Sequence, residues 1–88
     1  MIVMKRDGRE DQYTKTKIHT AISKAIAEVT NGAGDNSLAT VITNRLDSRY
    51  RKRKRAISVE EIQDDIETEL MKEQAFDIAK VYVIQISA

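Results

Sequence analysis

Apolar residues recur along the chain with the spacing of amphipathic helices, most clearly at positions 15–29. There the apolar positions follow an i, i+3, i+4, i+7 order and fall on one helix face: Ile18, Ala21, Ile22, Ala25, Ile26 and Val29. Thr14 is a good N-cap residue for this helix, and Tyr13 and Ile18 are spaced to form a hydrophobic staple. The pattern therefore predicts a helix over these positions.

A second helix is expected after a polar loop at positions 31–36. Gly32 is placed to cap the end of the first helix, and Asn36 or Ser37 can cap the start of the second, which should reach at least Tyr50. Its buried side is expected to comprise Leu38, Val41, Ile42, Leu46 and Tyr50. The glycines of the loop match neither the Walker nor the dinucleotide-binding spacing, so we interpret the loop as a helix connection.

Two further helices are expected in the second half of the chain. The third begins after Ser58, which can form a capping box with Glu61. Its apolar face comprises Val59, Ile62, Ile66, Leu70 and Met71. The last begins at Phe76 and runs to about Ile86. The apolar face predicted for it comprises Phe76, Ala79, Val83 and Ile86, with Lys80 and Tyr82 to the sides.

Short segments with strand character accompany these helices. Residues 2–5 and 10–13 can pair as a β-hairpin, because Asp7 and Gly8 between them form a strong turn dipeptide. Residues 56–57 can add a third short strand beside the hairpin. We therefore predict the α+β class: a four-helix bundle covered by a small three-stranded β-sheet that consists of the N-terminal hairpin and one short strand.

Composition limits the class of protein. The 88 residues, 41% hydrophobic and 33% charged, suffice for one domain with a modest core, so residues 1–88 are expected to form a single domain. Lys5 and Arg6 interrupt the apolar start of the chain, and no apolar run approaches the length of a membrane span. We therefore expect a cytoplasmic protein without a membrane anchor. The absence of cysteine excludes disulfides, thiolate zinc sites and a thiol nucleophile.

Enzyme chemistry finds little support in the sequence. The one histidine, His19, lies four residues before Ser23 and thus on the same helix face, but no third residue is visibly placed to orient its ring. We interpret His19 as a structural residue and expect neither catalytic residues nor a metal site.

Charge is unevenly distributed although the formal net charge is only +1. Every residue from Arg49 to Arg55 except Tyr50 is Lys or Arg, and acidic residues recur every four positions further on, at Glu61, Asp65, Glu69 and Glu73. These acidic residues stack on one helix face and repel one another. Two interpretations are open: the basic block is neutralised by this stripe or by solvent, or each block is left for a partner, including nucleic acid for the basic one.

Two cations precede the hairpin turn. Lys5 and Arg6 end the first strand, where alternation directs them to opposite faces unless the turn twists the backbone. Such a pair suggests a phosphate chain as ligand, with a solvated hairpin tip as the alternative. Lys17 in the first turn of the first helix also favours a nearby anion, because the helix dipole disfavours a cation at this end.

Several short motifs in a characteristic order resemble the ATP-cone family. They are residues 3–8 (VMKRDG), then Lys17 and Ile18 with a helix rich in alanine and isoleucine, then residues 59–62 (VEEI) and 77–82 (DIAKVY). The resemblance covers nearly the whole chain. The family comprises small regulatory nucleotide-binding domains, usually at the N-terminus of ribonucleotide reductase subunits, and also occurs in a zinc-containing repressor of reductase genes.

The resemblance implies that the chain binds ATP or dATP, together with Mg²⁺, and catalyses no reaction itself. Bound nucleotide would control the activity or oligomerisation of a ribonucleotide reductase, with reductase subunits or another ATP cone as partners. Lys5, Arg6 and Lys17 would contact the phosphates, and adenine would lie between the hairpin and the first helix on Val3 and Ile22. The nucleotide-binding residues expected on this basis are Val3, Lys5, Arg6, Asp11, Thr14, Lys17, Ile18, Ile22, Val59 and Gln63.

The sequence departs from the family's pattern at Val59, a position where a threonine often helps to bind the nucleotide, and Gln63 one turn on is the remaining polar candidate. Basic residues usually follow the last helix, whereas this sequence stops at Ala88, which fits either a fragment of a longer subunit or a free-standing domain. Two other functions stay open. One is a nucleic-acid-binding or transcriptional regulatory module that uses the 49–55 block, and the other is a purely structural assembly domain.

Overall fold

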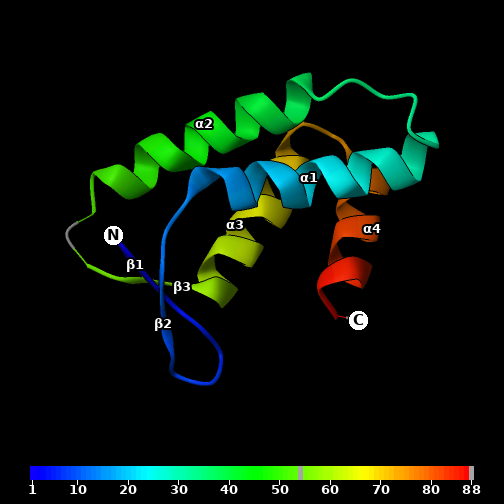
Figure 1. The fold of residues 1–88 in the computed structure, drawn as a ribbon. Coiled ribbons are helices and arrows are strands. Elements are labelled where there is room, and N and C mark those ends of the chain that lie inside the picture. The colour runs from blue at the N-terminus through cyan, green and yellow to red at the C-terminus, as the bar shows by residue number, and fades with distance from the viewer. Residues whose placement is uncertain (54, 88) are drawn as a thin grey trace.

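The computed structural model describes residues 1–53 and 55–87, which form four helices and one small sheet (Figure 1). The elements follow in the order β1 (Ile2–Met4), β2 (Glu10–Gln12), α1 (Lys15–Thr30), α2 (Ser37–Arg51), β3 (Ile57–Ser58), α3 (Val59–Lys72) and α4 (Phe76–Ser87). Helix α1 packs against α2 and α4, and α3 packs against α2 and α4. The predicted α+β class, with a helix bundle and a three-stranded sheet, is confirmed.

The sheet has the strand order β2-β1-β3, with β1 antiparallel to β2 and parallel to β3. Val3 occupies its centre, since it pairs with Asp11 on one side and with Ile57 on the other. The predicted turn is confirmed: Gly8 adopts a φ of 87°, and its N–H donates to the Lys5 carbonyl at 3.0 Å. β1 and β2 each end one residue before their predicted ranges end, and β3 is shifted by one residue toward the C-terminus. The pairing of β1 with β3 brings the hairpin to the start of α3.

The predicted faces of α1, α2 and α3 form most of the core. Ile22 and Ile42 are fully buried, as the helical period predicts. Three residues assigned to these faces are exposed instead, namely Val29 (39%), Val41 (47%) and Met71 (48%). Val41 and Met71 lie on the margins of their apolar stripes and Val29 lies in the last turn of α1, and a domain of this size has too few elements to cover every apolar residue.

The apolar face predicted for α4 is only partly correct. Ala79 and Tyr82 are buried, whereas Phe76 is 55% exposed and Val83 and Ile86 are only half-buried. Helix α4 carries apolar residues around most of its circumference, so periodicity does not identify its buried side. Packing against α1 and α3 determines which side of α4 is buried. No helix within the described residues has the length and hydropathy needed to cross a membrane.

The helices begin and end close to the predicted positions, but not every predicted capping residue forms a capping hydrogen bond. Ser58 caps α3 as predicted, since its hydroxyl accepts a hydrogen bond from the Glu61 backbone N–H at 3.0 Å. Thr14 and Asn36 occupy the N-cap positions of α1 and α2 without a side-chain capping bond. At the C-terminus of α1, Asn31 takes the left-handed cap conformation one residue before the predicted glycine.

The basic block at the end of α2 folds against the acidic stripe of α3. Glu69, whose side chain is 1% exposed, accepts hydrogen bonds from Arg45 at 2.6 Å and Arg49 at 3.2 Å. Glu61 pairs with two further arginines of the block. Mutual neutralisation is therefore confirmed for these residues, while Lys54 lies outside the described residues.

Candidate functional site

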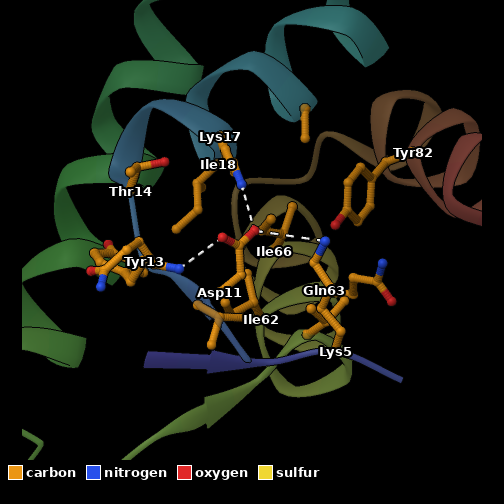
Figure 2. Close-up of a pocket in the computed structure, with 14 residues that line it drawn as sticks. Lys5, Asp11, Tyr13, Thr14, Lys17, Ile18, Ile62, Gln63, Ile66 and Tyr82 are labelled. Carbon is orange, nitrogen blue, oxygen red and sulfur yellow. Dashed lines mark hydrogen bonds and ion pairs between the residues drawn. The ribbon is translucent and has the colours of Figure 1, made fainter. Parts of the chain in front are cut away.

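A pocket lies where the sheet meets α1, α3 and α4 (Figure 2). It has a volume of about 250 Å³, and its lining comes from both hairpin strands, the first turns of α1, the N-terminal half of α3 and one residue of α4. The β1–β3 pairing creates this arrangement, because it places the start of α3 beside the strand that ends in the predicted phosphate-binding cations.

Two lysines converge on one carboxylate at the mouth of the pocket (Figure 2). The Lys17 Nζ lies 2.9 Å from Asp11 Oδ2, and the Lys5 Nζ lies 3.7 Å from the same oxygen. The Lys17 hydrogen bond, the Gln12 backbone N–H and the nearby Lys5 charge together hold the pKa of Asp11 below its usual value. Asp11 thus stays ionised and occupies a position suited to an anion.

The inner wall of the pocket is mainly apolar. Ile18 and Ala21 contribute from α1, and Val59, Ile62 and Ile66 contribute from α3 at the spacing of one helix face. Lysines at the mouth and an apolar wall behind them suit a ligand with a flat apolar body and a charged tail.

Eight of the ten predicted nucleotide-binding residues line this pocket: Val3, Lys5, Asp11, Thr14, Lys17, Ile18, Val59 and Gln63. The other two do not. Ile22 is fully buried in the core, so it offers no surface to a ligand, and its neighbour Ala21 lines the pocket instead. Arg6 lies outside the lining, where its Nη2 donates to Gln63 Oε1 at 2.9 Å and its Nε lies 3.1 Å from Glu60 Oε1.

Six lining residues have no counterpart in the sequence prediction: Gln12, Tyr13, Ala21, Ile62, Ile66 and Tyr82. The two isoleucines follow from the period of α3 once Val59 and Gln63 are assigned to the site, because they lie on an adjacent strip of that helix. Tyr82 lies 65 positions after Lys17 (82 − 17), and no local pattern brings the two together.

The two tyrosines of the pocket are held in defined environments. The Tyr13 hydroxyl donates to Asp47 Oδ1 of α2 at 2.7 Å, and burial together with this carboxylate raises the pKa of Tyr13. Burial is the main cause that raises the pKa of Tyr82 to about 12, and the negative charges of Glu67 and Asp64 raise it further. Both phenols therefore remain protonated at neutral pH, and the Tyr13 hydroxyl acts as a hydrogen-bond donor.

His19 lies away from this pocket, among hydroxyl groups. Its Nδ1 is 3.4 Å from Ser23 Oγ and its Nε2 is 3.2 Å from Thr40 Oγ1. A threonine hydroxyl does not stabilise an imidazolium as the carboxylate of a catalytic triad does. The structural interpretation of His19 therefore stands as the simpler one.

Comparison with known proteins gives an independent indication of the family. Residues 1–85 match the family described as the ATP cone domain. The chain is also 38% identical over 89 aligned residues to a vitamin B12-dependent ribonucleoside-diphosphate reductase of Thermoplasma acidophilum. That alignment covers 93% of this chain but only 11% of the reductase.

Proposed function

This chain belongs to the ATP cone domain family, and on that basis we propose that it binds ATP or dATP and regulates a ribonucleotide reductase. The observation that carries the proposal is the pair of lysines, Lys5 and Lys17, in front of an apolar pocket. Ammonium groups favour phosphate oxygens, and apolar side chains favour the face of a base.

In the proposed complex, the phosphates replace the Asp11 carboxylate as the partner of the two lysines. Arg6 joins them from the rim after leaving Glu60, with which it forms a solvent-exposed ion pair. The base rests on Ile18, Ala21 and the apolar residues of α3. Ile22 does not contact the base as expected, because it is buried in the core. A pocket of about 250 Å³ lies just below the usual range for ligand pockets, so the triphosphate extends beyond it into solvent.

Mg²⁺ enters this proposal with the nucleotide. Asp11 is the carboxylate among the described residues of the pocket lining, and its partners are two lysines. A single carboxylate fits a Mg²⁺ ion that takes most of its ligands from phosphate and water, as is usual for nucleotide-bound magnesium.

Regulation requires binding without hydrolysis. A nucleotide shifts the activity or the assembly of a larger enzyme only if it binds two states of that enzyme with different affinity. We propose that the parent of this domain is a ribonucleotide reductase and that its partners are reductase subunits or a second ATP cone. The similarity to the Thermoplasma acidophilum reductase supports this assignment.

Calorimetric titration of the chain with ATP, dATP, GTP and CTP tests the proposal. ATP and dATP should bind with one tight phase, and at a hundredfold excess over the dissociation constant each should stabilise the fold by about 2.7 kcal/mol. At the same concentration, GTP and CTP should stabilise the fold much less. Equal effects of all four nucleotides would show binding to charge alone and would refute an adenine pocket.

A further inference from the structure

A second groove lies on the opposite side of the sheet from the nucleotide pocket. It has a volume of about 550 Å³ and combines three arginines with an apolar floor: Arg51, Arg53, Arg55, Met1, Ile2 and Ala56, with Glu10 at its edge. Strand alternation separates the two sites, because Ile2 contributes to this groove whereas Val3 contributes to the pocket. Figure 1 shows the end of α2 and the start of β1 at the same end of the molecule, and residues from both line the groove.

Two of the arginines have side-chain partners within the fold, and of these Arg51 is 67% exposed and Arg53 only 24%. Arg51 Nε donates to Asp47 Oδ2 at 2.8 Å, and Asp47 is itself held by the Tyr13 hydroxyl. The Arg53 guanidinium lies 5.5 Å from the centroid of the buried Tyr50 ring and pairs with Glu61. Such guanidinium groups lose little conformational freedom when they bind a further anion.

Arg55 is the least compensated of the three arginines. Glu61 is shared between Arg53 and Arg55, and the Arg55 Nη2 is 3.7 Å from Glu61 Oε2, which is too long for a hydrogen bond. The Arg55 side chain is 67% exposed. Each guanidinium has five N–H donors, so Arg51 and Arg55 can each donate to a further carboxylate in addition to their present partners.

We propose that this arginine groove binds an acidic segment of a protein partner, with carboxylates on Arg51 and Arg55 and an apolar side chain on the floor formed by Met1, Ile2 and Ala56. A peptide fits better than nucleic acid. The apolar floor offers nothing to a phosphate backbone, and Glu10 and Glu61 repel a ligand that carries a charge on every unit. A peptide can instead place its charged and apolar side chains to match. The proposal does not depend on ATP binding.

Fluorescence anisotropy of the full chain with three labelled probes tests the proposal. The first probe is a short peptide in which glutamate alternates with leucine, the second replaces each glutamate with glutamine, and the third is a short DNA duplex. The acidic peptide should bind at least about tenfold more tightly than the glutamine peptide, because its carboxylates meet oriented guanidiniums.

Matched variants locate the site. Arg55→Glu should weaken the acidic peptide about tenfold, and Glu10→Gln should tighten it about threefold. Lys80→Glu makes the same change of charge on α4, which does not contribute to the groove, and should leave affinity within about twofold. Circular dichroism and ATP titration of Arg55→Glu should match the parent chain, which separates loss of the groove from loss of the fold or of nucleotide binding.

Three results would overturn the proposal. Equal binding of the acidic and glutamine peptides would show that the arginines do not bind the carboxylates of the peptide. Equal losses in the Arg55 and Lys80 variants would mean that only the total charge matters. Tighter binding of the DNA duplex than of the acidic peptide, with the same Arg55 dependence, would assign the groove to nucleic acid.

Discussion

Replacing Lys17 with alanine is the most direct test of the nucleotide pocket. In the free chain the Lys17 side chain is 68% exposed and bound to Asp11, so its removal costs the fold little. Lys5 remains as a partner for Asp11 at 3.7 Å. The melting temperature without ligand should therefore change by less than about 2 °C.

The effect of Lys17→Ala on ATP should be much larger. A charge-assisted contact contributes about 1.5–3 kcal/mol, and the exposure of this ammonium favours the lower end, which corresponds to a roughly tenfold rise in the dissociation constant. Calorimetric titration measures it. Lys15→Ala is the matched control, because Lys15 is exposed in the same helical turn and does not line the pocket. If both variants lose affinity equally, or if Lys17→Ala retains full affinity, the phosphates do not bind here.

Three further predictions concern the fold. Burial by itself would raise the pKa of Glu69, but hydrogen bonds from Arg45 and Arg49 hold it below its usual value. Glu69→Gln should therefore lower the free energy of unfolding by about 1–3 kcal/mol at neutral pH, and in urea titrations this deficit should shrink as the pH falls below the ordinary pKa of a glutamate and through the lowered pKa of Glu69, where the parent chain takes up the proton too. Gly8→Ala should destabilise the hairpin by about 1 kcal/mol in thermal melts, since φ at Gly8 is 87° and no atom lies within 4 Å of the added Cβ; an unchanged melt would exclude backbone strain. Ser58→Ala should cost about 1 kcal/mol through loss of the α3 cap, whereas Ser58→Asp should retain most of the stability.

The fold was predictable wherever one face of an element differs clearly from the other. In α1, apolar and polar sides alternate with the helical period, and Ile18, Ile22 and Ile26 are buried as predicted. In α4 the apolar residues surround the helix, so the burial of Tyr82 and the exposure of Phe76 depend on what α1 and α3 present to it. The period of a sequence reports the orientation of a helix only when the helix has a polar side.

Buried polar groups were the harder part to predict. Glu69 is 1% exposed although glutamate is seldom buried, because two arginines of α2 reach it from a distance of 20 or more positions in sequence. The acidic stripe on α3 indicated a basic neighbour but not which carboxylate would be enclosed. Asp65 of the same stripe accepts the Tyr50 hydroxyl at 2.6 Å instead of an arginine.

The candidate site also contains residues that the sequence could place together and residues that it could not. Lys5, Asp11 and Lys17 lie within one hairpin and the helix turn that follows it, so strand pairing and helix geometry suffice to bring them together. Tyr82 and the α3 residues reach the pocket only through the parallel pairing of β1 with β3 and the packing of α4. The position of Arg6 depends on the twist of the turn, which strand alternation alone leaves undetermined.

The two lysines of the pocket already share one carboxylate in the free chain, and this shapes how a nucleotide can bind in the proposed complex. Asp11 contacts both Lys5 and Lys17, so a phosphate gains the lysines only by displacing a carboxylate that the same lysines stabilise. The net gain is then the difference between a phosphate and a carboxylate as partners, and it grows with the negative charge of the ligand, which is about two for a monophosphate and larger for a triphosphate. A triphosphate has several charges and can contact both ammonium groups at once. Exchange with Asp11 therefore favours nucleoside triphosphates over monophosphates before the base makes any contact, and the apolar wall is left to distinguish one base from another.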